Sequence, residues 1–470
     1  MKKLRKWMML IIIAMLVLTT ACSSGSSGNS NESGNQNAGS GNQHQQQQQE
    51  NNNQQNQEQT GAAEEEADDE PAELVFYSTS RDSEEVFNER FGDAIRAKFP
   101  NYTIKYIQRV PDSTDLNLLI TSGEQIDIIF DSLGSFPGSV IKHGMAYDMT
   151  ELMNKYGVDL ERFEPTLIEA MKQISGGKIY GLPVENNVTV IFYNKDIFDM
   201  FGVEYPRDGM TWTEFTELAK QLNVESGGTV YAGYAPSVNH LVIQNSWSMS
   251  LIDPETNQST YGDERWKTII ETEFLSYANN SNYVKAMETY RKGGMLNSNQ
   301  FLKDRILAMF PGGPLWPFVL KADLDQINWD MVAMPTYEEL PGVGYQSYPT
   351  YFAITNTAKN KDAAMKAIAY LVSEEFQMEM SKKGNMTTLN NPDIMAAMGT
   401  ESEYKDKNFG AYFYNKFAPI RQLNPLEVEY SPLYALTNRI PGIVNGQYDL
   451  NTALREAQEE ANQGIQEVSK

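Results

Sequence analysis

Most of the chain alternates between short apolar segments that favour strands and longer segments with helical periodicity. We expect strands at residues 73–77, 103–107 and 126–130, and a helix over residues 86–99 between the first two. Strands that alternate with helices form βαβ units on a mainly parallel sheet, so the pattern predicts an α/β fold. Ligands of such sheets bind beyond the carboxyl ends of the strands, which makes the loops after the first and third strands candidate site loops.

The alternation continues toward the C-terminus. Thr211 and Glu214 have the spacing of a capping box, in which a hydroxyl and a carboxylate satisfy the amides at a helix start. Trp212 and Phe215 begin this helix and are expected in the core. Further strands are expected at residues 188–193, 307–310 and 351–355, and further helices at residues 361–372, 433–442 and 450–468.

Residues 1–21 have the layout of an export signal. Basic residues between positions 2 and 6 precede an apolar run at residues 8–18, and small residues then lead to Cys22, the single cysteine of the chain. The apolar run is shorter than the roughly 20 residues that a membrane-spanning helix needs. Residues 18–22 (LTTAC) resemble a bacterial lipobox, which implies that Cys22 becomes the lipidated first residue of the mature protein.

Residues 22–72 are expected to form a disordered polar tether. After Cys22 they are built mainly from Ser, Gly, Asn, Gln, Glu and Asp, and they contain no Lys or Arg. Such a segment cannot bury enough apolar surface to offset the entropy lost on ordering. A flexible tether of this length would reach about 40 Å and could hold a globular body away from a membrane.

Composition and motifs exclude several classes of function. A formal net charge of −24 argues against nucleic-acid binding, because phosphate contacts require clustered Lys and Arg. One cysteine excludes a disulfide scaffold and a structural zinc site built on thiolates. The sequence contains no nucleophile elbow, phosphate-binding loop or EF-hand loop, and His44, His143 and His240 lie in no catalytic motif. We therefore expect a binding protein rather than an enzyme, with no cofactor and no metal.

Four groups of residues resemble one known family in order and spacing. The first comprises residues 177–183 (GKIYGLP) and 192–196 (FYNKD), then Phe198, Gly202, Pro206 and residues 211–215 (TWTEF). The others comprise Ala308, Met309, Gly312, Gly313 and Trp316; residues 352–355 and 358–364; and Gly446, Asp449, Ala453, Leu454 and Ala457. Over almost all of residues 73–470 the chain resembles the extracellular solute-binding proteins of ABC importers, in the carbohydrate-binding group that includes maltose-binding protein. It departs from the family at residues 348–351 (YPTY), where paired glycines are common.

The resemblance implies two α/β lobes joined by crossover strands, with the ligand in the cleft between them and hinge closure around it. Lobe one would take residues 73–187 and about 350–390, and lobe two residues 188–349 and about 391–470. The implied protein is a monomer, attached to the outer face of the cell membrane only through its lipid. It would pass a sugar or oligosaccharide to the membrane subunits of an ABC permease.

Sugar recognition needs aromatic faces for the ring and planar polar groups for the hydroxyls. Trp316 follows a Gly-rich turn at a position where the family presents a stacking Trp, and Gln244 and Trp247 combine an amide and an aromatic ring in one stretch. Core packing of Trp247 is equally consistent with the pattern. Asn186 and Asn187 lie at the first crossover, where Asn187 matches a ligand-contacting position of the family.

Further candidates lie on the expected strand ends. Asp131 follows the third strand and could face the ligand or cap a helix. Ser80 and Arg81 lie on the exit loop of the first strand, where Arg81 could bind hydroxyls or an acidic sugar, or pair with Asp82 as an ordinary surface residue. The family positions add Tyr351 and Tyr434.

Three other functions remain open at this level. A protein of the same fold could bind a peptide or another small solute, or could be a sensor subunit that reports its ligand to a membrane kinase. A secreted carbohydrate hydrolase needs two suitably placed carboxylates, and the adjacent pair Glu374 and Glu375 points apart on a helix end. The hydrolase is therefore the least supported.

Overall fold

The computed structural model describes residues 70–470. The predicted signal sequence, Cys22 and all but the last three residues of the predicted tether lie outside the described residues. Strand β1 begins at Ala72, one residue before the start expected for the folded body. Within residues 70–470, no helix has both the length and the apolar character that crossing a membrane requires.

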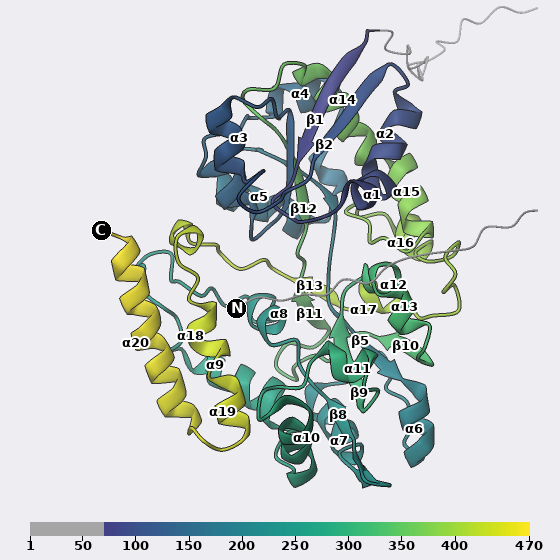
Figure 1. The fold of residues 1–470 in the computed structure, drawn as a ribbon, viewed down its shortest axis with the longest axis vertical. Helices are drawn as coiled ribbons and strands as arrows, with labels where there is room; N and C mark the ends of the chain where they lie inside the picture. The colour runs from purple at the N-terminus through teal and green to yellow at the C-terminus, as the bar shows by residue number, and fades with distance from the viewer. Residues whose placement is uncertain (1–69) are drawn as a thin grey trace, which may run out of the picture. The chain divides into compact units, whose positions relative to one another are not determined.

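The first sheet has five strands in the order β2-β1-β3-β12-β4 (Figure 1). Their bounds are β1 (Ala72–Tyr77), β2 (Tyr102–Ile107), β3 (Ile128–Ser132), β4 (Leu182–Glu185) and β12 (Thr350–Ile354). Strand β1 is parallel to β2 and β3, whereas β12 is antiparallel to both β3 and β4. Four strands therefore point one way, and β12 alone is reversed.

The second sheet has the order β10-β5-β9-β8. Its strands are β5 (Val190–Asn194), β8 (Ala232–Tyr234), β9 (Leu307–Gly312) and β10 (Trp329–Val332). Strand β5 is antiparallel to β9 and β10, and β8 is parallel to β9, so β5 is the one reversed strand here. Two further pairs are β11 (Val343–Gln346) with β13 (Lys416–Ala418), and β6 (Glu225–Ser226) with β7 (Thr229–Val230).

Both sheets are mixed: all strands but one in each sheet run in the same direction, and this agrees with the expected α/β lobes with mainly parallel sheets. The reversed strand in each sheet is the one that enters from the other lobe: β5 follows β4 of the first lobe, and β12 follows β11 of the second lobe. Each enters at the edge where its neighbours end, because Thr350 of β12 pairs with Ser132 of β3, and Val190 of β5 pairs with Gly312 of β9. A strand that starts where its neighbours stop must run antiparallel to them.

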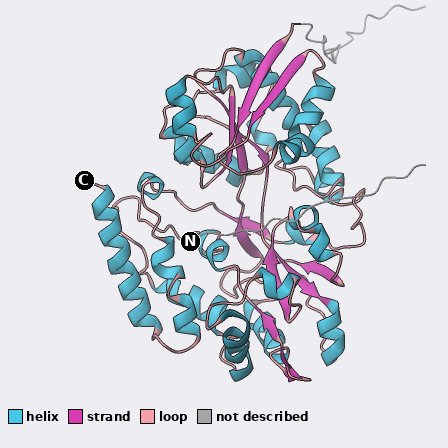
Figure 2. Cartoon of the chain, in the orientation of Figure 1, coloured by secondary structure: helices cyan, strands magenta, loops and turns pink. Residues whose placement is uncertain are grey.

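Helices flank both sheets (Figure 2). Those near the first sheet are α1 (Glu84–Phe87), α2 (Asp93–Lys98), α3 (Leu116–Ser122), α4 (Thr150–Lys155), α5 (Pro165–Ser175), α14 (Lys361–Leu371), α15 (Glu374–Lys382) and α16 (Pro392–Ala396). A π-helical turn, η1 (Asn88–Gly92), joins α1 to α2 across the expected helix at residues 86–99. Short turns are η2 (Pro137–Ile141) and η3 (Leu160–Arg162).

The second sheet carries more helices. They are α6 (Lys195–Phe201), α7 (Trp212–Gln221), α8 (Val238–Ile243), α9 (Glu264–Ile270), α10 (Ser281–Arg291), α11 (Ser298–Leu302), α12 (Trp316–Val319), α13 (Lys321–Leu324), α17 (Ala411–Tyr414), α18 (Leu433–Thr437), α19 (Ile440–Val444) and α20 (Leu450–Val468), with η4 (Glu271–Leu275) and η5 (Pro425–Val428). The expected helix at residues 433–442 is two helices, α18 and α19. The capping box of α7 is present, since the Thr211 N–H donates to Glu214 at 3.0 Å and the Glu214 N–H to Thr211 at 3.3 Å.

Two separate hydrophobic cores define two lobes. The first lobe packs around buried residues drawn from 74–184 and 351–394, with Ile420 from the C-terminal part. The second lobe packs around residues drawn from 188–345 and 398–461, with Met386. Trp212 and Phe215 belong to this second core, as expected. Each lobe is thus assembled from discontinuous parts of the chain.

A carboxylic acid lies within the second core. Glu273 is fully buried, and its Oε1 accepts a hydrogen bond from the Tyr337 hydroxyl at 2.5 Å. Its other oxygen and the buried hydroxyls of Tyr234 and Tyr345 have no hydrogen-bond partner among the described residues. Burial disfavours the charged form and raises the pKa of Glu273 to about 7.

This shift makes stability depend on pH. Between about pH 4.5 and 7 the folded state keeps the Glu273 proton that the unfolded state releases, so stability falls as pH rises through this range. We expect a loss of about 2–4 kcal/mol between pH 4.5 and 8, from about 1.4 kcal/mol per pKa unit. Urea unfolding at several pH values should show this loss in the wild type and in the exposed control Glu271→Gln, but not in Glu273→Gln. An equal loss in Glu273→Gln would contradict the assignment.

Candidate functional site

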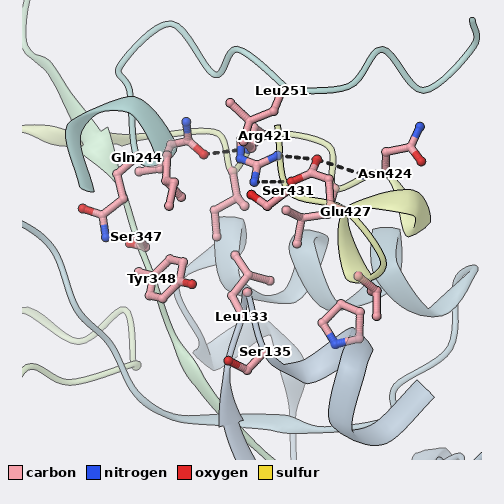
Figure 3. Close-up of a pocket in the computed structure, with 17 residues that line it drawn as sticks. Leu133, Ser135, Gln244, Leu251, Ser347, Tyr348, Arg421, Asn424, Glu427 and Ser431 are labelled. Atoms are coloured by element: carbon pink, nitrogen blue, oxygen red, sulfur yellow. Dashed lines mark hydrogen bonds and ion pairs between the residues drawn. The ribbon is translucent and has the colours of Figure 1, made fainter. Parts of the chain in front are cut away.

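A pocket of about 240 Å³ lies between the lobes. The first lobe contributes the loop after β3, and the crossover into β12 contributes a second side. The end of α8 and a C-terminal segment complete it (Figure 3). The lining residues are Leu133, Gly134, Ser135, Pro137, Ile243, Gln244, Leu251, Gln346, Ser347, Tyr348, Ile420, Arg421, Leu423, Asn424, Glu427, Val428 and Ser431. The pocket therefore lies at the carboxyl end of a first-sheet strand, where ligand sites of α/β folds are expected.

Residues 420–431, here called the C-terminal wall, form the largest continuous part of the lining. Hydrogen bonds fix the wall to the second lobe at both ends. The Ser248 hydroxyl donates to the Pro419 carbonyl at 2.6 Å, and the Tyr261 hydroxyl donates to the Pro432 carbonyl at 3.0 Å. The Asn424 amide donates to Asn257 at 2.8 Å. The wall is thus an ordered part of the site.

The same wall also contacts the first lobe. Ile420 belongs to the first core, and Leu423 packs against it. Val428 faces Gly138, where an added Cβ would lie 3.5 Å from its side chain. Lys142 forms an ion pair with Glu429 at 2.8 Å on the rim, where both side chains are more than two-fifths exposed. Apolar packing therefore carries most of this contact, because exposed ion pairs contribute little.

One glutamine joins the wall to the crossover. The Gln346 side chain donates to the Asn245 carbonyl at 2.7 Å, and its oxygen accepts the Arg421 N–H at 2.7 Å. The Gln346 backbone N–H donates to the Gln244 carbonyl at 2.9 Å. Gln346 is buried, so all these bonds are shielded from water.

Asn186 and Asn187 connect the two crossover strands rather than lining the pocket. The Asn186 amide donates to the Ser347 hydroxyl at 3.1 Å. The Tyr348 N–H donates to the Asn187 carbonyl at 2.7 Å. These bonds place both asparagines beside the pocket-lining residues Ser347 and Tyr348. They also occupy some of the hydrogen-bonding groups of the two asparagines.

Of the predicted ligand-binding residues, Gln244 lines the pocket, where its oxygen accepts a bond from Thr189 at 2.9 Å. Trp247 is half-buried against the second core, with its ring centroid 5.4 Å from that of Tyr337. Trp316 is half-buried too, and its ring stacks on that of Phe310 with the centroids 5.6 Å apart. Neither tryptophan belongs to the pocket lining.

The predicted residues of the first lobe also have structural partners. Asp131 lies inside β3, and its Oδ1 accepts bonds from the Thr79 N–H at 2.9 Å and the Ser78 hydroxyl at 3.1 Å. Burial raises the pKa of Asp131. Ser80 accepts a 3.0 Å bond from Ser78. Asp131 thus holds the loop after β1 against β3.

Arg81 is exposed, and its expected partner Asp82 instead pairs with Arg90 at 2.8 Å. Tyr351 is a core residue rather than a residue of the pocket wall, since it is fully buried and its hydroxyl donates to the Leu167 carbonyl at 2.6 Å. Tyr434 is 55% exposed at the start of α18. A ligand role for any of these side chains stays a prediction.

The polar residues of the C-terminal wall were absent from the sequence-based candidates. Arg421 and Glu427 form a two-pronged ion pair, with Nη1 donating to Oε1 at 2.8 Å and Nη2 to Oε2 at 2.7 Å. Asn424 caps η5. Asn424, Pro425 and Glu427 have the spacing of a capping box with Pro at the first helical position. This spacing is the feature of the sequence that could have indicated an ordered turn here. Within residues 70–470, no group of His, Cys, Asp and Glu side chains could hold a metal ion.

Residues 78–378 match the family described as "Bacterial extracellular solute-binding protein". The chain belongs to this family. This solute-binding protein is 30% identical over 102 residues to the lactose-binding protein of Rhizobium radiobacter, a match that spans 21% of either chain. The family is one of binding proteins, in agreement with the expectation that the chain is not an enzyme.

Solved structures share the fold of this solute-binding protein. A sugar transporter of Rhizobium etli has a TM-score of 0.65 at 20% identity, covering 84% of this chain and 99% of that one. An ABC substrate-binding protein of Listeria monocytogenes, solved with cycloalternan, has a TM-score of 0.61 at 17% identity and coverage of 84% and 100%. The sugar-binding protein MalE of Xanthomonas citri has a TM-score of 0.63 at 16% identity, covering 84% and 98%.

The pocket wall contains a glycine that a larger residue cannot replace freely. A Cβ at Gly134 would collide with the Tyr348 hydroxyl and lie 3.3 Å from Cζ. We expect Gly134→Ala to lower the free energy of unfolding by about 1–3 kcal/mol, as overpacking does. Chemical denaturation should show that Tyr348→Phe restores much of this loss in the double variant. Gly313→Ala is the control, because a Cβ added at Gly313 would have no atom within 4 Å. A neutral Gly134→Ala would mean that Tyr348 moves freely.

Proposed function

We propose that this solute-binding protein captures a sugar or oligosaccharide in the pocket between its lobes and delivers it to the membrane subunits of an ABC importer. The observation that carries the proposal is the position and chemistry of the pocket. It is lined by both lobes, a crossover strand and the C-terminal wall, and it combines amide and hydroxyl groups with apolar side chains.

A saccharide has hydroxyls that need directional partners and a C–H face that favours apolar or aromatic contact. The polar partners would be the side chains of Ser135, Gln244 and Ser431. The half-buried ring of Tyr348 supplies an aromatic surface in the same pocket. Relatives of the same fold support the assignment, since their solved structures hold cycloalternan or mannobiose.

Ligand capture would close the lobes around the pocket. The crossover strands at residues 185–190 and 346–350 are the hinge elements that absorb the backbone change. A ligand that touches both lobes binds the closed form better than the open form, and this difference in affinity shifts the population toward closure. The closed form would be the one that the importer recognises.

A ligand screen tests the proposal. A saccharide present at a hundredfold excess over its Kd should stabilise the protein by about 2.7 kcal/mol in a thermal-shift assay. Gln244→Ala should weaken binding about tenfold, because it removes one hydrogen-bonding amide from the pocket. The exposed Gln326→Ala is the control. Stabilisation by a peptide, with no response to any saccharide, would contradict the sugar assignment and leave the fold unaffected.

We further propose that Cys22 carries a lipid that holds the protein on the outer face of the cell membrane. The export-signal layout of residues 1–21 and the lipobox-like residues 18–22 support this proposal. The extracellular character of the family agrees with it.

Fractionation of cells expressing the full chain tests the anchor. The wild type should lie in the membrane fraction and incorporate a fatty-acid analogue supplied to the cells. Cys22→Ser should lose the label and, if the signal is still cleaved, leave the membrane. Ser24→Ala should behave as the wild type. A Cys22→Ser protein that keeps the label would contradict lipidation at this residue.

A further inference from the structure

Among residues 70–470, only two charged side chains line this pocket. They are Arg421 and Glu427, both from the C-terminal wall, and every other lining residue is apolar, an amide, a hydroxyl or a glycine. The pocket lining therefore carries one positive and one negative charge.

These two charges neutralise each other inside the wall. Their two parallel hydrogen bonds, at 2.8 and 2.7 Å, occupy both carboxylate oxygens of Glu427 and both terminal nitrogens of Arg421 (Figure 3). The side chains are only 6% and 12% exposed. Pairing cancels both charges, so neither side chain offers an unneutralised charge to a ligand, while the guanidinium keeps further N–H groups for hydroxyls.

Further hydrogen bonds hold the Arg421 backbone and one Glu427 carboxylate oxygen in place. Gln346 accepts the Arg421 N–H at 2.7 Å. Glu427 lies in η5, which is capped by Asn424 and begins with Pro425, and its Oε1 also accepts the Asn424 N–H at 3.4 Å. Releasing one charge for a ligand would leave the other buried without a partner, which is costly.

Two charge clusters outside the lining are paired, whereas the buried Asp131 near the end of β3 keeps one oxygen without a hydrogen-bond partner among the described residues and does not line the pocket. Lys142 and Glu429 form the ion pair on the rim, and Arg90 in the first lobe is bound by both Asp82 and Glu185. Arg81 is exposed and does not line the pocket. A ligand with a net charge would thus lose its hydration without meeting a free opposite charge in the lining.

We propose that the Arg421–Glu427 pair makes this pocket select uncharged saccharides over uronic acids and amino sugars. The inference rests on the proposed function, because it concerns the ligand of the same pocket. The pair gives the pocket polar groups with no net charge. Neutral ligands rich in hydroxyls can therefore bind without the cost of burying an unpaired charge.

The experiment compares matched neutral, acidic and basic saccharides by calorimetry on the full chain. Suitable probes are glucose, galactose and mannose with their uronic acids and amino sugars, and cellobiose, mannobiose and galactobiose with the disaccharides of the matching uronic acids or amino sugars. In the wild type we expect the neutral member to bind at least about tenfold more tightly than its charged counterparts, with little dependence on salt.

Variants of the pair should change this preference in opposite directions. Glu427→Gln leaves Arg421 unpaired and should raise the affinity for the uronic acid relative to the neutral sugar by about tenfold or more. Arg421→Gln leaves Glu427 unpaired and should favour the amino sugar. The double variant should return to the neutral preference. Glu204→Gln, at an exposed carboxylate outside the lining, is the control.

The outcomes separate the two proposals. A wild type that binds a charged saccharide as tightly as its neutral counterpart overturns the selectivity and leaves the sugar-binding function in place. A wild type that binds no saccharide of any kind overturns both. If one single variant fails to fold, as thermal unfolding would reveal, the wild-type comparison still tests the selectivity and the other single variant still tests the role of the pair. Folded single variants with unchanged preference overturn the role of the pair.

Discussion

The architecture depends on where the chain crosses from one lobe to the other. Each crossing strand starts at the edge of its new sheet where the neighbouring strands end. Its hydrogen-bonding partners then require it to run antiparallel to them. This explains why β12 and β5 are the only reversed strands in their sheets. It also brings the carboxyl ends of the remaining strands of both sheets toward the crossovers, where the polar groups of strand-end loops gather.

Within this frame, buried hydrogen bonds of a few amide side chains set the shape of the site. Gln346 bonds to Asn245 and to Arg421, so one side chain holds α8, the crossover and the C-terminal wall together. Asn186 links the two crossovers through Ser347. Amides suit this task because each offers both donors and an acceptor without a charge that would have to be neutralised.

Local sequence patterns predicted much of the fold. The expected strands at residues 73–77, 103–107 and 126–130 overlap β1, β2 and β3, and the capping box at Thr211 marks the start of α7. The one reversed strand in each sheet was not predicted, because periodicity reports which face of a strand is buried and not which neighbour it pairs with. Four motif groups in order indicated the family that the comparison shows.

The candidate site was predicted only in part, for a physical reason. Gln244 lines the pocket, and the loop after β3 was expected there from strand topology. Trp247 was a candidate by residue type and Tyr351 by its family position, but an aromatic ring has the same appearance in a sequence whether it packs in a core or faces a ligand. The C-terminal wall lies in an irregular segment with no periodicity, so its contact with the distant loop after β3 depends on tertiary packing alone.

The C-terminal wall has a consequence for how such proteins diversify. It is a single stretch that pairs with neither large sheet, and it supplies both charged groups of the pocket. Exchanging this stretch would change what the cavity accepts while every strand keeps its register. A scaffold built in this way can acquire new cargo by local replacement, which fits the retention of one fold among structures that are only 16–20% identical to this chain.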